Sequence, residues 1–175
     1  KDSWSLFVNA AGIARQQGLS LVASSQSHFN QDYLSHSLLG FQFKTSKYGA
    51  YGISVENFSV DYSGSSLSAE TAIGFHQGIM LRSDRSSSFS IGYGIKYYNI
   101  DYGSSAGPSG DGSDGIKLGS LSTFGLDISF LGSLADRIKV GAKALNINSP
   151  TLGDANNSTR LPQRSQIGIA YSPYD

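Results

Sequence analysis

The residue types that usually carry catalysis or bind metals are few in this sequence. It holds three histidines, His28, His36 and His76, and no cysteine among its 175 residues. A metal site brings several ligands to within about 2 Å of one ion, and no carboxylate lies at tight spacing to any of these histidines. We therefore expect no metal and no cofactor, and histidines that are solvated or hydrogen-bonded.

Serine is abundant, but the sequence does not single out a catalytic serine. Serine catalysis needs a base that a third group orients, and no Gly-x-Ser-x-Gly motif stands at a strand-to-helix turn. The stretch Asp111-Gly-Ser-Asp114-Gly115 is partly similar to a calcium loop, but it lacks the full ligand series and the closing glutamate. We expect a flexible surface loop there, and a protein that is not an enzyme.

The composition argues against a nucleic-acid partner and for a folded chain. Lys+Arg and Asp+Glu number 13 each, and no basic block is present for a phosphate backbone. Charged residues are 15%, below the roughly 25% that is typical of soluble domains. Hydrophobic residues are 39%, more than a disordered chain carries. The sequence has no apolar run long enough for a transmembrane helix.

The dominant pattern has a period of two residues, which is the spacing of a β-strand. From Phe89 to Tyr97, large apolar residues alternate with serine, glycine and Lys96. Segments with this pattern lie at 19–29, 37–45, 49–60, 69–82, 88–101, 120–131, 137–147 and 165–172. Most are as long as a tilted membrane-spanning strand, which needs about 9–11 residues, whereas a soluble strand usually has about 5–6.

The connections between these segments alternate in length. Short ones lie at 46–48, 83–87 and 132–136, and longer ones lie at 30–36, 61–68, 102–119 and 148–164. This alternation is typical of an outer-membrane barrel, which has tight turns on one side and longer loops on the other. The sequence therefore predicts an all-β fold: an up-and-down antiparallel transmembrane β-barrel of about eight long strands at 19–175, after an N-terminal segment at 1–18.

The two faces of the predicted strands differ in residue size and charge. One face carries large apolar side chains and no charge in the strand centres, with Asn57 and Gln77 as polar exceptions. Because a lipid-facing charge at the bilayer midplane costs about 2–4 kcal/mol, this face is predicted to face lipid. The other face combines small residues with isolated charges of both signs, and we expect it to line the lumen. Its candidate residues are Glu56, Glu70, His76, Lys96, Asp127 and Lys143, with Lys139 as a further cation.

A soluble β-sandwich or lipocalin-like barrel also alternates, with its apolar face inward. The small residues favour the membrane barrel, because glycine weakens a strand on a water-washed face and suits a crowded lumen. Aromatic residues near strand ends, such as Tyr48, Tyr51 and Tyr97, could form girdles at the membrane interfaces. They could also reflect the ordinary preference of aromatic residues for strands.

Several short motifs point to one family. The stretch Asn9-Ala-Ala-Gly-Ile-Ala14 follows an apolar segment at 4–8. Further short motifs that match the same family lie at 47–50, 90–98, 137–146 and 167–174. The first stretch resembles the Asn-Pro-Ala-Gly-Leu-Ala signature of FadL-like outer-membrane barrels, including the PorV/PorQ group associated with type IX secretion. Ala10 stands where that family usually has proline.

The resemblance implies that residues 4–14 form a short helix or hatch entering the lumen, with Asn9, Ala11 and Gly12 as its motif. It implies a bacterial outer-membrane protein that transports hydrophobic compounds or assists protein export. The expected partners are outer-membrane lipid and either hydrophobic small molecules or secretion-system proteins.

Barrels of this family are longer, so we expect part of a larger barrel, with a closed eight-stranded barrel as the alternative. Two other functions stay open. One is a structural or binding barrel with the loops 102–119 and 148–164 as contact surfaces. The other is a soluble secreted β-sandwich acting as an adhesin or carbohydrate binder.

Overall fold

The computed structural model describes residues 3–45, 48–62, 65–105, 107–110, 114–154 and 157–173. Residues 46 and 47 of the first predicted turn, residues 111–113 of the Asp111–Gly115 stretch and residue 174 lie outside these ranges. These ranges contain three short helical segments: α1 Ser5–Val8, η1 Ala10–Arg15 and η2 His28–Asn30. None of the helices in these ranges is long and apolar enough to cross a membrane.

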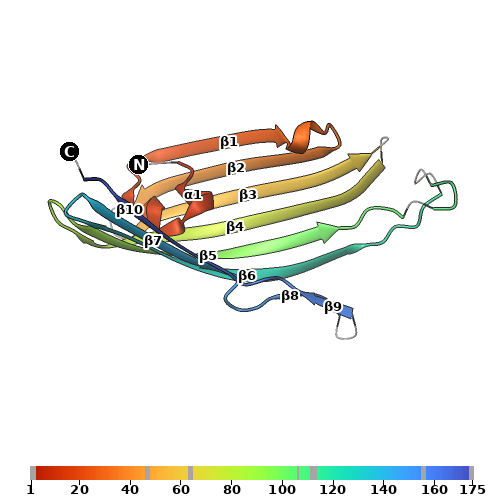
Figure 1. Cartoon of the computed structure of the whole chain (residues 1–175). Coiled ribbons are helices and arrows are strands. Elements are labelled where there is room, and N and C mark those ends of the chain that lie inside the picture. The colour runs from red at the N-terminus through yellow and green to blue at the C-terminus, as the bar shows by residue number, and fades with distance from the viewer. Residues whose placement is uncertain are drawn as a thin grey trace.

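Eight strands form one antiparallel up-and-down sheet in the order β1-β2-β3-β4-β5-β6-β7-β10 (Figure 1). Their bounds are β1 Leu19–Ser27, β2 Leu34–Thr45, β3 Gly49–Tyr62, β4 Ser65–Ser83, β5 Ser88–Asp101, β6 Ser120–Leu134, β7 Ile138–Leu145 and β10 Arg164–Tyr171. Each of the eight segments predicted from the period of two is one of these strands. The prediction of an all-β antiparallel sheet is therefore confirmed.

Two connections differ from the prediction. The prediction of a long loop at 61–68 is wrong, because β3 and β4 stay paired out to Tyr62 and Ser65, with a register shift after Val60. Serine and glycine in this stretch indicated a loop, but Ser65, Ser66 and Ser68 are paired with β3. The loop at 148–164 holds a second, two-stranded sheet made of β8 Thr151–Asp154 and β9 Asn157–Arg160.

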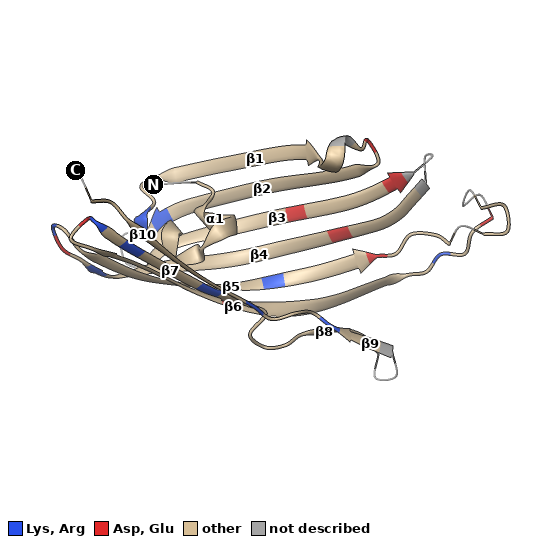
Figure 2. Ribbon diagram, viewed as in Figure 1, with Lys and Arg blue, Asp and Glu red and all other residues tan. Residues whose placement is uncertain are grey.

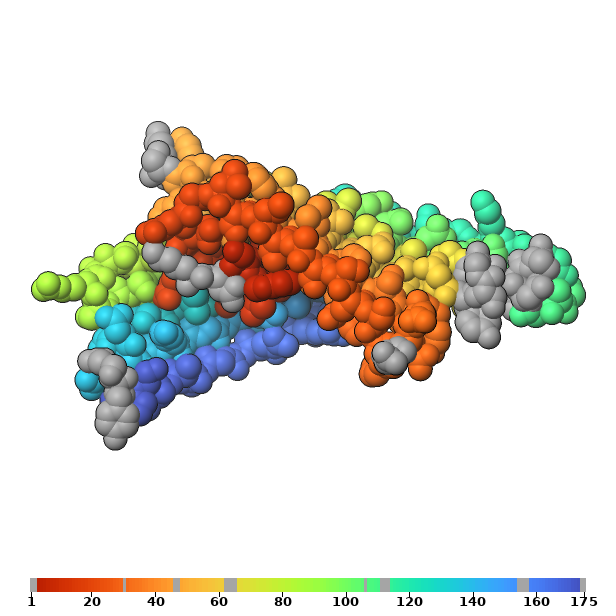
Figure 3. Space-filling view, turned by 90° about the horizontal axis from the view of Figure 1, so that it is seen from above, coloured from red at the N-terminus to blue at the C-terminus, as the bar shows by residue number. Residues whose placement is uncertain are grey.

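The sheet is open, so the closed barrel is not present in this structure. Among the described strands, β1 pairs only with β2, and β10 pairs only with β7. The sheet curves, and the N-terminal helices lie on its concave side (Figure 1). Seen from above, the N-terminal segment lies between the first strands and the last strands (Figure 3).

Burial is the reverse of that in a soluble sheet. The outward face is the face opposite the concave side. Its large apolar residues are about half exposed, as for Phe75 at 48% and Ile128 at 50%. Polar residues of the concave face are buried: Ser54 is 1% exposed and His76 is 3% exposed. The apolar core is small, since it consists of Leu6, Ile13 and Ala50, with Phe7 packed against it. Within the described residues, the apolar face of this sheet is therefore left largely uncovered.

Glycines on the concave face let the N-terminal segment approach the sheet backbone. A Cβ added to Gly92 would lie 2.2 Å from the backbone nitrogen of Ala11, and one added to Gly78 would lie 2.6 Å from Cγ1 of Ile13. Gly52 likewise leaves room for Leu6. These strand positions tolerate no larger residue while the segment is docked.

Replacing Gly92 with alanine should loosen the N-terminal segment. The added methyl group would overlap backbone atoms that cannot rotate away, so we expect destabilisation of about 1–3 kcal/mol. The free energy of unfolding in urea and the rate of proteolysis within residues 3–15 measure the effect. Gly168→Ala is the matched control, because nothing lies within 4 Å of its added Cβ. Equal effects of the two substitutions would contradict this account of the concave face.

Candidate functional site

Asn9 fastens the N-terminal segment to the sheet. Its Oδ1 accepts a hydrogen bond from the backbone N–H of Ala11 at 3.0 Å, which caps the start of η1. Its Nδ2 donates to the carbonyl of Phe130 on β6 at 3.0 Å and to that of Ala142 on β7 at 3.3 Å. One side chain thus shapes the helical turn and binds it to two neighbouring strands.

Ala11 is held by two serines of the sheet. Its N–H also donates to Ser129 Oγ at 2.9 Å, and its carbonyl accepts from Ser90 Oγ at 3.0 Å. A Cβ on Gly12 would lie 2.8 Å from the Cβ of Ser5, so a glycine lets the two helical segments pack closely. The motif residues Asn9, Ala11 and Gly12 are therefore the points where the segment contacts the sheet or itself.

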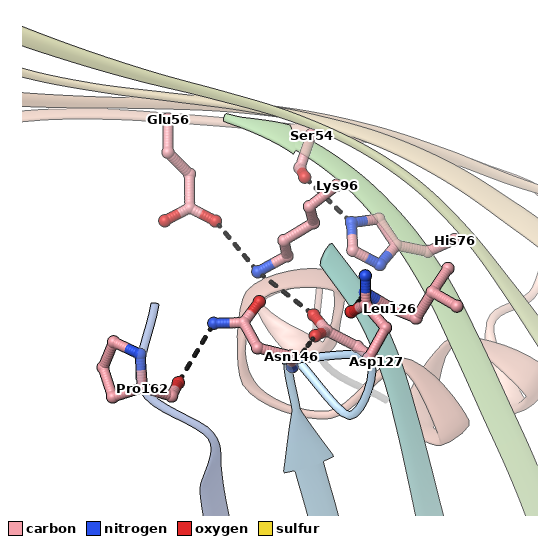
Figure 4. A network of polar contacts seen from close by, with 9 residues as sticks. Ser54, Glu56, His76, Lys96, Leu126, Asp127, Asn146 and Pro162 are labelled. Atoms are coloured by element: carbon pink, nitrogen blue, oxygen red, sulfur yellow. Dashed lines mark hydrogen bonds and ion pairs between the residues drawn. The ribbon is translucent and has the colours of Figure 1, made fainter. Parts of the chain in front are cut away.

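Three charged residues of the concave face form one network (Figure 4). Lys96 Nζ lies 3.7 Å from Glu56 Oε1 and 3.6 Å from Asp127 Oδ2. The side chains of Lys96 and Asp127 are 12% and 9% exposed, and that of Glu56 is 30% exposed. Buried charges are stable only when they are paired, and one lysine here serves two carboxylates from different strands.

Asn146 connects this network to the loop that follows β7. Its backbone N–H donates to Asp127 Oδ1 at 2.9 Å, and its Nδ2 donates to the carbonyl of Pro162 at 3.2 Å. Asn146 has φ of 56°, a left-handed conformation that ends β7 and that asparagine adopts more readily than most residues. The loop containing β8 and β9 is in this way fixed to the sheet.

His76 is a hydrogen-bonded residue of the concave wall. Its Nε2 lies 2.9 Å from Ser54 Oγ, and its ring lies against Gly74 and Gly94, where a Cβ would come within 2.6 Å or less of it. No group of three or more histidine, cysteine or acidic residues that could hold a metal occurs in the described ranges. Within those ranges His76 thus has the geometry of a hydrogen-bonding wall residue.

The structure brings five of the six predicted lumen residues to one part of the concave face. Lys143 lines a small cleft with His76, Lys96 and Asp127, directly beside α1. Glu70 lies further along β4 and is exposed. It lines a hollow of about 360 Å³ together with Glu56. Figure 2 shows that charged positions are sparse along β3, β4 and β5, with acidic ones on β3 and β4 and a basic one on β5.

Other residues of this hollow escaped the sequence analysis. Tyr98, Asn146, Pro162 and Arg164 also line it. Tyr98 and Arg164 lie on the same side of their strands as the predicted lumen residues, so the alternation of side chains could have identified them. Asn146 and Pro162 could not be identified in that way, because they lie outside the regular strands. The hollow offers charge, hydrogen-bonding groups and apolar contact.

Comparison with models of protein families, with curated proteins and with solved structures gives no match for this chain.

Replacing Lys96 with methionine should destabilise the fold. Two partly buried carboxylates would lose their cation, and breaking such a pair typically costs about 3–5 kcal/mol. Because Glu56 is partly exposed, we expect the lower end of that range. Lys139→Met is the control, since Lys139 is on the same face but is exposed. A double-mutant cycle with Asp127→Asn should show coupling between Lys96 and Asp127, and strict additivity of the two effects would contradict the network.

Proposed function

We propose that this chain forms part of the wall of a bacterial outer-membrane β-barrel, with the N-terminal segment inside the lumen as a plug. The proposed role is passage of hydrophobic compounds, or assistance of protein export, through that lumen. One observation carries the proposal: the apolar face of the sheet is the exposed face, and the polar face is buried. An apolar face without a protein partner is expected where lipid is the solvent.

On six strands the outward face changes from apolar to polar. One row of paired residues is apolar: Ala23, Leu39, Val55, Ile73, Tyr97 and Phe124. The next outward-facing row is polar: Ser25, Ser37, Asn57, Thr71, Asn99 and Ser122. Each of these strands therefore has an apolar stretch that ends at a polar one, as strands of a barrel wall do where they leave the hydrocarbon core.

The apolar stretch has a suitable length. On β5 it runs from residue 89 to residue 97 without a charged side chain on the outward side. A tilted strand needs about 9–11 residues to cross the hydrocarbon core, and this stretch reaches the lower end of that range. The wall is thus of the right scale to cross the hydrocarbon core.

Gln77, a polar exception on the outward face, is satisfied by hydrogen bonds. Its Nε2 donates to the carbonyl of Tyr48 at 2.7 Å, and its Oε1 accepts from the hydroxyl of Tyr93. Unpaired amide groups in hydrocarbon are costly, whereas paired ones are tolerated. The polar side chain of Gln77 is therefore compatible with a lipid-facing surface.

The plug supports a barrel with more than eight strands. The interior of an eight-stranded barrel is just wide enough for the side chains of its own wall. Here the concave face also accommodates α1 and η1. The edges of β1 and β10 would need further strands, because unpaired backbone groups in lipid cost several kcal/mol each.

The alternatives receive less support. A soluble β-sandwich would leave about half of each large outward side chain in contact with water, unless a second sheet covered that face. A purely structural barrel would give no reason for a plug held by hydrogen bonds to individual wall residues. The loops 102–119 and 148–164 stay candidate contact surfaces for secretion-system proteins.

A folding test addresses the membrane assignment. The 175 residues should show a β-type circular dichroism spectrum in detergent and aggregate in plain buffer. If these residues close a barrel alone, or by association of copies, unheated samples should also migrate differently from boiled samples on an SDS gel. A monodisperse β-protein in plain buffer would rule out the membrane wall.

Asn9→Ala should make the plug easier to displace. The substitution removes two hydrogen bonds to the wall and the cap of η1, and the cap alone contributes about 1 kcal/mol. We expect faster solute entry in liposome swelling assays with the folded protein. Asn148→Ala is a matched control, because Asn148 also bonds a carbonyl and an N–H of the sheet but lies far from the plug. Faster entry with the control alone would contradict a gating role for the segment.

A further inference from the structure

A second hollow lies on the outward face, near the turns that join β4 to β5 and β6 to β7. It has a volume of about 540 Å³. Its apolar lining residues are Phe89, Phe130, Gly132, Leu134, Ile138 and Val140. Arg82 and Asp84 belong to the same hollow, at the end next to the β4–β5 turn. It is distinct from the polar hollow of the concave face.

Gly132 is part of the lining of this second hollow, which we call the groove. Phe89, Gly132 and Val140 are cross-strand neighbours on β5, β6 and β7. The rings of Phe89 and Phe130 lie 4.5 Å apart, and a Cβ on Gly132 would lie 3.3 Å from Cζ of Phe130. The ring of Phe130 therefore packs close over the glycine, and the hollow is lined beside it by aromatic and branched residues.

Arg82 gives the groove a positively charged end. A register shift between Met80 and Arg82 pairs Arg82 with Phe89, which brings the arginine into the outward-facing row. In the described strands it is the one lysine or arginine on that face. Its Nε lies 2.6 Å from Asp84 Oδ2, and its side chain is 75% exposed. A guanidinium has five N–H donors, so this ion pair leaves donors for an additional anion.

We propose that this groove binds one phospholipid, with an acyl chain over Gly132 and the phosphate at Arg82. The proposal rests on the membrane assignment above. Arginine is well suited to phosphate, because its planar donors bind two oxygens at once. A cation at the rim of an otherwise apolar surface matches a molecule that is charged at one end and apolar along its length. Bulk lipid would contact the whole outward face, whereas this site should hold one anionic lipid preferentially.

Tryptophan fluorescence in vesicles tests the site. The chain has a single tryptophan, so Trp4→Phe gives a background without tryptophan. In that background Phe130→Trp is the groove reporter, and Phe75→Trp is the surface reporter on another exposed part of the outward face. The probe is phosphatidylglycerol with a brominated acyl chain, mixed into unbrominated phosphatidylcholine vesicles.

The apparent affinity for brominated phosphatidylglycerol, taken from the quenching curve, should be about fivefold higher at the groove reporter than at the surface reporter. This is the expected effect of one arginine near an anionic lipid. Arg82→Gln should remove this preference. Asp84→Asn should increase it, because the competing carboxylate is lost. These opposite effects separate binding from general damage, and the circular dichroism spectrum in detergent verifies the fold of each variant.

The outcomes distinguish the two proposals. Equal quenching of both reporters, or a preference that survives Arg82→Gln, would overturn the lipid site and leave the membrane wall intact. If neither reporter is quenched, the protein is not inserted, and the membrane assignment fails together with the site.

Discussion

The close contact between the N-terminal segment and the glycines of the concave face is the constraint on which the rest of the structure depends. Strands rich in glycine are weak by themselves, because glycine loses more conformational entropy on folding and brings no side chain to pack. Here the missing packing comes from Leu6 and Ile13, which are almost fully buried against the sheet. Among the described residues, the large side chains of the apolar core therefore come from outside the strands of the sheet, and Ala50 of β3 is the member that the sheet itself supplies. Its polar inner face and apolar outer face follow from that arrangement.

The charged network places a second constraint on the same face. Lys96 has glycines as its cross-strand neighbours, Gly74 on β4 and Gly125 on β6. The space over those glycines is taken by His76 and Ser54 on one side and by Asn146 and Tyr98 on the other. The lysine reaches to Glu56 and Asp127 beside them. Buried ion pairs contribute less to stability than to specificity, since any other register would leave a charge unpaired. The network thus favours one alignment of β3 with β6 in a wall whose small residues would otherwise tolerate several.

The sequence was sufficient to predict the eight strands and the separation of their faces, because side chains of a strand alternate strictly between its two sides. It was not sufficient for features that depend on which residues face each other. Lys96 could be named as a candidate for pairing, but its partners follow from the register. The connection between β3 and β4 was mispredicted, since Gly64 and its serine neighbours have loop composition while the ladder continues on both sides. Closure of the sheet depends on strands that pair at β1 and β10, which periodicity within a strand does not specify.

The interactions of the N-terminal segment differ in how easily they could be replaced if it moved. Ser90 Oγ also lies 3.3 Å from the carbonyl of Leu131, and Ser129 Oγ lies 3.2 Å from that of Gly92, so both hydroxyls keep a partner without the segment. Leu6 and Ile13 have no such alternative, and exposing each would cost about 1.5–3 kcal/mol. The free-energy cost of displacing the N-terminal segment therefore comes mainly from exposing apolar side chains. In the proposed transport role, a hydrophobic compound that occupied the same glycine-lined surface would recover part of that cost. A polar solute would not, so the composition of this contact by itself would favour apolar cargo.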